Sequence, residues 1–417
     1  MRILVLDGNE NQSVACVRSL ARAGHSVSVG ADSSWSKAGW SRFSHSSFQY
    51  ISPQQDAAAF VERIAMEAGR EAGTLVLPMT EQTTLPLSAA RARILERGGR
   101  LVLPAHETVL RAFDKQQTTR LAASLGIDVP QTSLLLERKQ AEEFAVAARY
   151  PVVLKPRMSE EMSADGKVRA TGAPVYARDA QGLIAGFDEL SRRSSSVLAQ
   201  EFVEGEGAGY FALMREGELR AEFAHRRIRD VRPTGSGSAV RSSVVPQKAL
   251  REAGLSILRA LGWHGVAMVE FRLRPDGVPV FLEVNGRFWN SLPLAVYAGA
   301  DFPGLLAQLA EHGEVETPPV YREGVRCRWL LGDFRHLLEV WRGAPEGFPG
   351  RFPKRLETLR DFLVPVGGTF HDNFMMRDPL PELGDWLHFI FRRLPARFNK
   401  KGLAGKDVHV QRGYSLP

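Results

Sequence analysis

Cysteine is scarce in this chain of 417 residues, which holds only Cys16 and Cys327. The two cysteines lie far apart and match no paired-ligand spacing, so the sequence suggests neither a disulfide framework nor a zinc site. A chain that does without disulfides fits a reducing compartment, and we expect a cytoplasmic location.

Long apolar runs are also missing. The first apolar segment, RILVLD, is broken by Asp7 before it could form a signal-peptide core, and no later stretch approaches the ~20 apolar residues of a spanning helix. Peripheral membrane contact stays open, because residues 386–401 combine Trp386 and other aromatic side chains with a cluster of cations. Packing of this segment against the rest of the protein is the simpler alternative.

Two familiar binding patterns are absent as well. The turn after the first apolar segment, DGNENQ, lacks the G-x-G-x-x-G pattern, so a dehydrogenase-type dinucleotide site is poorly supported. The formal net charge of +7 favours anionic ligands, but the basic residues accompany no recognisable nucleic-acid reader motif. We therefore expect no nucleic-acid partner.

Short apolar segments alternate with helical periodicity over the first hundred residues. RILVLD, HSVSVG, TLVLP and RLVLP read as strands, and helices are expected near residues 13–23, 56–70 and 84–97. Strands that alternate with helices imply parallel crossovers. We therefore predict a small Rossmann-like parallel α/β domain over residues 1–112.

A mixed α+β pattern follows. A helix ends at Gly126, and the strands PVVLKP and SVLAQEFV flank a polar stretch at 157–173; helices are expected over 138–148 and 179–192. Strands then dominate, with a Glu-Gly turn at 216–217 and one helix over 246–261. We predict a second domain over 113–312, divided into 113–196 and 197–312. The C-terminal extension, 313–417, looks helical over 321–343.

The strongest local inference concerns a predicted hairpin around Asp276-Gly277, a preferred two-residue loop of type I′. With that loop, Glu270 falls opposite Glu283, and Asn285 falls one pair further along the same face. Facing carboxylates repel, whereas a good cross-strand pair contributes only ~0.2–1 kcal/mol. The arrangement therefore predicts a compensating cation.

Magnesium is the natural cation for two carboxylates and an amide oxygen, because it prefers oxygen ligands and takes further ones from water and phosphate. Arg287 lies two residues beyond Asn285 and could meet phosphoryl charge beside the metal. In the alternative interpretation, these polar residues line the solvent face of an ordinary hairpin and Arg287 neutralises an acid.

These residues, in MVEFR and FLEVNGRFWNS, resemble the metal-binding end of the ATP-grasp superfamily of carboxylate-amine ligase type. FDKQQT, YPVVLKP and LAQEFVEGEG follow the same family pattern in the right order upstream. The resemblance covers residues 1–312 and implies an ATP-grasp fold preceded by the small α/β domain. The fold class is therefore α/β and α+β, with a C-terminal extension.

The resemblance also implies roles for individual residues. It places ATP phosphates at Lys115 and Lys155, and Mg²⁺, with Mn²⁺ as an alternative, at Glu270, Glu283 and Asn285. Lys155 and Arg287 would take part in phosphoryl transfer. The residues expected at the adenine and ribose are Gln200, Glu201, Phe202, Val203 and Glu206, with Glu204 as the alternative for ribose because Gly207 occupies the usual position of the ribose acid.

Two further stretches suggest substrate contacts. The segment HRRIRDVRPTGSGSAV offers Arg226, Arg227 and Arg229 as clamps for a carboxylate or phosphate, although a basic exposed strand explains it equally well. Glu81 follows an apolar strand at the edge where open α/β sheets bind ligands. A helix cap would explain the neighbouring Thr80 as well.

The resemblance implies an ATP-dependent ligase that joins a small carboxylate to an amine through an acyl phosphate. A kinase built on the same fold, and a nucleotide-binding assembly protein without turnover, are the alternatives; a homodimer also stays open. Intact metal-site residues argue against the assembly protein.

Overall fold

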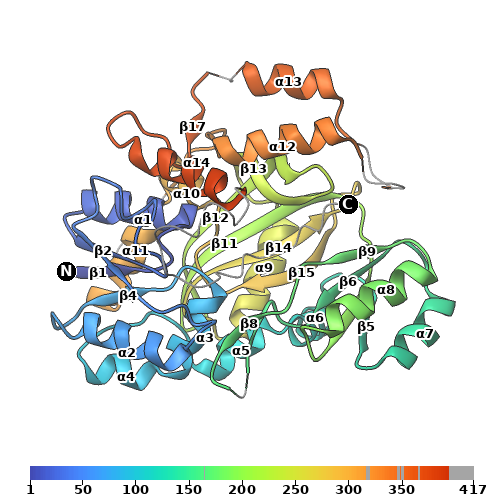
Figure 1. Cartoon of the computed structure of the whole chain (residues 1–417), viewed down its shortest axis with the longest axis horizontal. Coiled ribbons are helices and arrows are strands. Elements are labelled where there is room, and N and C mark those ends of the chain that lie inside the picture. Colours follow the sequence, from blue (N-terminus) through green and yellow to red (C-terminus); the bar gives the residue numbers. More distant parts are fainter. Residues whose placement is uncertain (164, 316–319, 345–347, 349–351, 365–366, 394–417) are drawn as a thin grey trace.

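The N-terminal domain is built on a parallel sheet. The computed structural model describes residues 1–417 except 164, 316–319, 345–347, 349–351, 365–366 and 394–417 (Figure 1). The sheet order is β3-β2-β1-β4, all parallel, which confirms the predicted α/β domain. Its elements are β1 (Arg2–Val5), α1 (Asn11–Arg22), β2 (Ser26–Ala31), β3 (Ser46–Gln49), α2 (Ala57–Ala68), β4 (Leu75–Leu77), α3 (Glu81–Ala89), α4 (Arg91–Glu96) and α5 (His106–Phe113).

Two details of this domain differ from the prediction. Strand β3 has no strong apolar alternation and was not predicted, and RLVLP forms only an isolated bridge between Arg100 and Leu75. The single helix predicted over 84–97 is two helices, α3 and α4, because the chain leaves helical geometry at Ala90.

A second unit carries an antiparallel sheet of order β5-β10-β6-β9. Its elements are α6 (Lys115–Ser124), β5 (Thr132–Leu135), α7 (Arg138–Ala147), β6 (Val152–Pro156), β9 (Val175–Ala177), α8 (Ala180–Ser191) and β10 (Val197–Glu201). The polar stretch at 157–173 contains a short hairpin, β7 (Glu160–Met162) with β8 (Val168–Ala170), which was not predicted. Alternation over three residues is too short a pattern to reveal such strands.

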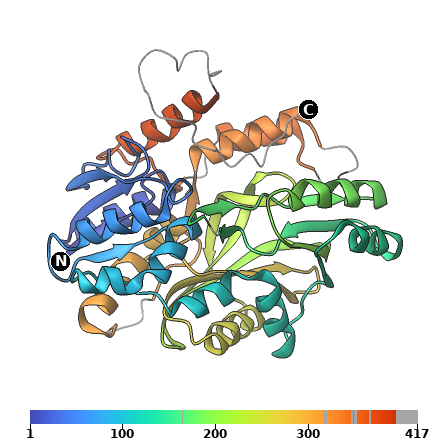
Figure 2. The same cartoon turned by 60° about the horizontal axis from the view of Figure 1, so that its bottom comes forward.

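The central sheet has the order β15-β14-β11-β12-β13-β16-β17. Figures 1 and 2 show the N-terminal domain (blue) and the α7/α8 unit (green) on opposite sides of it. Its elements and covering helices are β11 (Glu206–Arg215), β12 (Glu218–Arg232), β13 (Ser236–Val244), α9 (Lys248–Ala260), β14 (Gly265–Leu273), β15 (Pro279–Asn285), α10 (Leu292–Ala298), α11 (Phe302–His312), β16 (Arg326–Arg328) and β17 (Phe370–His371).

The C-terminal extension is part of this architecture. Strands β16 and β17 extend the central sheet beyond β13, and α12 (Leu330–Arg342), α13 (Arg355–Leu363) and α14 (Leu380–Arg393) follow. Residues 321–343 were predicted to be helical, which is wrong for 326–328: these residues pair with β13. Trp386 lies 5.3 Å, centroid to centroid, from Phe334 of α12, within the extension itself.

Residues 394–401 of the aromatic and basic segment lie outside the described residues. Within the described part of the chain, no helix is both long enough and apolar enough to cross a membrane.

Two hairpins of the central sheet use different turns. Glu216 and Gly217 both have positive φ, 48° and 85°, as a two-residue type I′ loop requires. At the second hairpin only Gly277 has positive φ, 85°, and Leu273 pairs with Pro279, so the predicted two-residue loop is wrong. The loop there has one residue more, in the manner of a type I turn closed by a left-handed glycine.

The predicted pairing of Glu270 with Glu283 is nevertheless confirmed. The register shifts between Glu270 and Phe271, because Leu282 is an extra residue that opposes no partner. This bulge compensates for the longer loop. Asn285 therefore also pairs with Met268, as the sequence predicted.

Candidate active site

A cavity of about 420 Å³ lies where the second unit meets the central sheet. Side chains from β6, β10, β12, β14 and β15 line it, together with the segment that follows β15. Predicted site residues on its wall are Lys155, Gln200, Glu201, Phe202, Val203, Arg227, Glu270, Glu283, Asn285 and Arg287. These residues come from distant parts of the sequence, and the fold brings them to one space.

One end of the cavity combines an amide with apolar groups. Gln200 is buried on β10 and donates a hydrogen bond of 2.9 Å from Nε2 to Thr132 Oγ1. The Phe202 ring packs edge-on to Tyr176 at 6.1 Å between centroids. An extended backbone beside flat apolar side chains suits a planar heterocycle.

Two lysines lie next to this end. Lys115 opens α6, where Asp114 caps the helix, and its Nζ donates to Ser159 Oγ at 2.8 Å. Lys155 lines the cavity from β6 and is 7% exposed. Burial lowers the pKa of Lys155 to about 8, an effect that nearby Lys115 reinforces and Glu283 opposes.

The paired carboxylates face these lysines. Glu270 accepts a hydrogen bond of 2.7 Å from Arg227 Nη2, and Glu283 Oε2 lies 3.8 Å from Lys115 Nζ. Burial opposes ionisation of Glu283, but Lys115, Lys155 and Arg287 together hold its pKa below the usual value. Glu283 can therefore be anionic at neutral pH in spite of facing Glu270.

The donor set suits a hard cation. Two carboxylates and the Asn285 amide provide oxygen ligands, which Mg²⁺ prefers when water and phosphate complete its shell. In the described residues, no group of three or more His, Cys, Asp or Glu is arranged for a metal, so these residues do not form a closed metal site by themselves. The sheet here presents an open site that needs further oxygen ligands.

Arg287 connects the predicted metal ligands to the N-terminal domain. Its Nη2 donates to Asn285 Oδ1 at 2.9 Å and lies 3.7 Å from Glu81 Oε1. Glu81 is the first residue of α3, which Thr80 caps, so both the cap and the predicted sheet-edge position are observed. Burial raises the pKa of Glu81, whereas Arg287 opposes that rise.

The structure separates the remaining predicted residues. Arg227 lines the cavity, Arg226 is exposed outside it, and Arg229 binds Asp333 through two contacts of 2.8 Å. Regular alternation would have kept Arg227 and Arg229 on one face, but the register is irregular on either side of Arg229. Glu206 begins β11 as an exposed residue outside the cavity lining.

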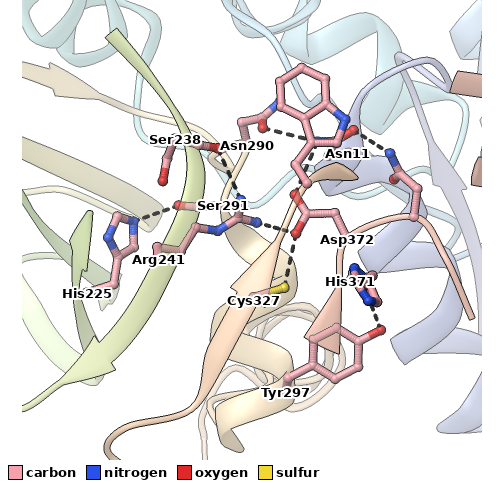
Figure 3. Close-up of polar contacts among 12 residues, drawn as sticks. Asn11, His225, Ser238, Arg241, Asn290, Ser291, Tyr297, Cys327, His371 and Asp372 are labelled. Atoms are coloured by element: carbon pink, nitrogen blue, oxygen red, sulfur yellow. Dashed lines mark hydrogen bonds and ion pairs between the residues drawn. The ribbon is translucent and has the colours of Figure 1, made fainter. Parts of the chain in front are cut away.

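Several lining residues were not predicted as site residues. His225 is buried, and its Nε2 lies 2.8 Å from Ser291 Oγ (Figure 3). Burial, with Arg227 and Arg241 adding to it, lowers the pKa of His225 well below its usual range, so the ring is neutral. Trp289, Asn290 and Ser291 directly follow the Glu-x-Asn-x-Arg alternation, and that proximity was the available signal.

Comparison with known proteins adds a family match. Residues 195–332 match a family model described as ATP-grasp in the biosynthetic pathway with Ter operon. The chain is 28% identical over 216 residues to the D-alanine–D-alanine ligase of Nitrosospira multiformis, which covers 48% of this chain and 66% of that relative. The match therefore spans just under two thirds of the relative's length.

Two solved structures are similar in fold. One is the biotin carboxylase domain of Hydrogenobacter thermophilus 2-oxoglutarate carboxylase, in complex with MgADP and bicarbonate: TM-score 0.60, 13% identity, 78% of this chain and 73% of that one. The other is the L-amino acid ligase from Bacillus licheniformis, with a TM-score of 0.56 and 17% identity over 77% of this chain and 75% of that one.

Proposed function

The chain is an ATP-grasp protein in its fold and in its family match, and on that premise we propose an ATP- and Mg²⁺-dependent ligase that joins a carboxylate to an amine. The single observation that supports this best is the shared cavity. Its lining includes Lys155, two facing carboxylates and Arg287, and the buried Lys115 lies 3.8 Å from Glu283.

The nucleotide would occupy the end lined by Gln200, Glu201, Phe202 and Val203. Lys115 and Lys155 would hold its phosphates as point charges with rotatable donors. Ribose contact by Glu206 requires the nucleotide to extend beyond the cavity wall, where that side chain is exposed.

Glu270, Glu283 and Asn285 would hold Mg²⁺, or Mn²⁺ in its place. The bound metal would neutralise charge on the phosphates and orient them. Arg227 now neutralises Glu270, so metal binding would compete with this contact. The residues fit the metal because all three line one cavity and carry oxygen ligands. They include two carboxylates rather than three, so water and phosphate oxygens would complete the shell.

The reaction is phosphoryl transfer followed by displacement. A carboxylate oxygen of the substrate attacks the γ-phosphorus of ATP, and the bond to ADP breaks. The amine then attacks the acyl carbon, phosphate leaves with the electrons of the carbon–oxygen bond, and the amine loses a proton. Arg287 stabilises charge on the transferred group.

Substrate contacts are assigned by position. Arg227 is the clamp that reaches the cavity, and Glu81 reaches it indirectly, through Arg287. Arg226 and Arg229 would serve only if a large substrate extended outside the cavity or displaced Asp333. The substrates are small molecules, as they are for the named ligases.

A hydroxylamine trap tests the proposal. The full chain is incubated with ATP, Mg²⁺, hydroxylamine and a panel of carboxylates that includes D-alanine, L-alanine, glutamate and acetate. We expect hydroxamate with at least one acid, and a loss of about 100-fold or more in Glu283→Gln. Glu252→Gln is the matched control, because Glu252 is exposed on α9 away from the cavity.

The outcomes separate the alternatives. Hydroxamate formation that survives Glu283→Gln would contradict the metal assignment. ADP release without hydroxamate, but with a phosphorylated product, would identify a kinase. An absence of ADP release with every acid, despite nucleotide binding, would point to an assembly protein.

Assembly and location belong to the same proposal. Cys16 and Cys327 are buried free thiols, which supports the cytoplasm. A homodimer is expected to give twice the 46.1 kDa chain mass in sedimentation equilibrium. A single-chain mass across micromolar concentrations would exclude it.

A further inference from the structure

Helix α14 presents an apolar side to solvent. Four residues at intervals of three or four positions lie on one side of this helix: Leu380, Leu383, Leu387 and Ile390. Leu380, Leu383 and Ile390 are 48%, 50% and 49% exposed, and Leu387 is partly exposed. We call these four residues the apolar stripe. Figure 2 shows α14 (red) at the edge of the molecule.

The other side of the same helix is acidic and buried. Glu382 and Asp385 are 7% and 6% exposed. Asp385 Oδ1 lies 2.9 Å from Lys37 Nζ, and Glu382 Oε1 accepts a hydrogen bond of 2.7 Å from Trp386 Nε1. A surface helix of a globular protein ordinarily buries its apolar side and exposes its charges, so α14 has the reverse arrangement. An apolar side left in water in this way marks an interaction surface.

Two tryptophans of the N-terminal domain lie beside this helix. Trp35 and Trp40 stack at 4.8 Å between ring centroids, and the Trp35 ring meets His388 of α14 edge-on at 5.9 Å. A Cβ atom added at Gly384 would come within 3.4 Å of the Trp40 ring. Both tryptophans are partly exposed. Aromatic and aliphatic groups from two distant parts of the chain therefore share one surface.

The exposed charge around this surface is positive. The three acids between residues 374 and 390 are all buried, whereas Arg377 is exposed. Two exposed arginines of the N-terminal domain contact the same segment. Arg22 Nη2 donates to Met375 Sδ at 3.2 Å, and Arg42 Nη1 donates to the Arg377 carbonyl at 3.3 Å. The acids of this segment thus face buried cations, and its surface carries arginine.

An anionic lipid bilayer matches these features together. Leucine and isoleucine side chains can enter the boundary of the acyl chains, and tryptophan rings favour the level of the headgroups. Anionic headgroups attract arginine. A second copy of the chain fits less well, because a two-fold interface centred on α14 would bring the arginines of one copy towards those of the other. Since no described helix can cross a membrane, the contact is peripheral.

We propose that α14 docks the protein on the surface of an anionic lipid bilayer. The docking face consists of the apolar stripe together with Trp35, Trp40, Arg22, Arg42 and Arg377. The inference goes beyond the proposed ligase function and does not depend on it, because the docking face contains no residue of the cavity lining.

Co-sedimentation of the full chain with lipid vesicles tests the docking face without nucleotide. Vesicles of phosphatidylcholine alone are compared with vesicles of an equimolar mixture of phosphatidylcholine and phosphatidylserine, at low and at high salt. We expect the wild type to bind the mixed vesicles about tenfold or more tightly than the neutral ones, because three arginines face the lipid. High salt should remove most of this difference.

The stripe variant, Leu383→Glu/Ile390→Glu, tests the apolar contacts. We expect it to bind mixed vesicles about tenfold or more weakly than wild type, because two apolar contacts are lost and two like charges face the lipid. The matched control is Met66→Glu/Leu95→Glu, at residues that are 53% and 49% exposed. It changes the net charge equally on α2 and α4, which lie on the other side of the molecule (Figure 1). We expect it to bind within about threefold of wild type.

A single arginine tests the charge contribution. We expect Arg377→Gln to bind mixed vesicles about threefold or more weakly than wild type, with unchanged binding to neutral vesicles. Arg193→Gln is the matched control, because Arg193 is an exposed arginine that follows α8. It should bind mixed vesicles within about twofold of wild type. All of these positions are exposed, so none of the changes requires repacking of a core.

The outcomes separate the possible occupants. Failure of the wild type to bind mixed vesicles, or equal losses in the stripe variant and its control, would overturn the docking face. Equal binding to neutral and mixed vesicles would overturn the role of the arginines. A lipid-free wild type of twice the chain mass, reduced to one chain mass by the stripe variant, would assign the stripe to a second copy and overturn the bilayer. Because the assay needs no turnover, hydroxamate failure alone would remove the ligase and leave the docking face.

Discussion

Where the C-terminal extension meets the N-terminal domain, Arg18 lies 2.8 Å from Asp378 and Lys37 lies 2.9 Å from Asp385. In the cavity, Lys115 lies 3.8 Å from Glu283 and Arg287 lies 3.7 Å from Glu81. Both regions bury charge. The first closes both of these ion pairs at hydrogen-bond distance, whereas the two cavity pairs stay longer and, of the cavity carboxylates, Glu270 closes a pair with Arg227 at 2.7 Å. The longer distances leave donors and acceptors that can bind a charged ligand.

The C-terminal extension is part of the same scaffold. Its aspartates supply the counter-charges for cations of the N-terminal domain, so the two regions stabilise each other across more than 300 residues of sequence. A buried cation left without its acid would be costly. The cavity can leave charged groups loosely paired because the short ion pairs of the surrounding scaffold stabilise the fold.

Breaking a closed pair should give the largest effect on stability. Arg18→Met leaves Asp378 buried with an unpaired charge, and we expect the free energy of unfolding to fall by about 3–5 kcal/mol. Urea denaturation measures it. Arg138→Met, which removes an exposed pair with Asp188, is the control and should cost about 0–1 kcal/mol. Similar losses in the two variants would erase the distinction between the regions.

Removing a cavity charge should have the opposite effects, namely a large loss of activity with little or no loss of stability. Lys155→Met is expected to lower the ligase rate about 100-fold, because a phosphate contact disappears. Its unfolding free energy should stay equal or rise, since a buried ammonium is no longer desolvated. Lys139→Met, on the exposed face of α7, controls for loss of a lysine. A strongly destabilised Lys155→Met would make Lys155 part of the scaffold instead.

The pH profile gives a smaller, graded test of the same lysine. Its folded pKa of about 8 means that the ammonium is present below that pH and is lost above it. We expect kcat/KM for ATP to fall about tenfold per pH unit beyond the pKa, whereas Lys155→Arg should stay flat. Stability should change in the other direction: between about 8 and ~10.4 the unfolded chain binds more protons, so stability rises with pH relative to Lys155→Met. A wild-type protein whose kcat/KM and stability do not change with pH in these directions would contradict both expectations.

The sequence predicted the cavity better than it predicted the scaffold. Glu270, Glu283 and Arg287 follow from alternation along one hairpin, Lys155 follows from the family resemblance, and the structure gathers them at one cavity. Arg229 does not follow those rules, because irregular register turns it towards Asp333.

Long-range partners lie beyond such local reasoning. Asn290 and Asp372 are connected by hydrogen bonds through Asn11. Three distant segments must therefore fold together before this connection forms. Strand β16 is likewise recognisable only beside β13, since three residues carry no periodicity of their own. Packing between distant segments determines these features.

The hairpin of β14 and β15 combines a local feature, the turn at Gly277, with a feature set by strand pairing, the bulge at Leu282. Gly277 has a φ of 85°, and a side chain added there would meet no atom within 4 Å, so Gly277→Ala suffers backbone strain alone. We expect a loss of about 1 kcal/mol in unfolding free energy and an unchanged ligase rate, since the bulge at Leu282, next to the carboxylates, sets their register. Urea denaturation and the hydroxamate assay on one preparation measure both. A rate loss approaching that of Glu283→Gln would mean that the turn aligns Glu270 with Glu283, and the hairpin tip would then belong to the site.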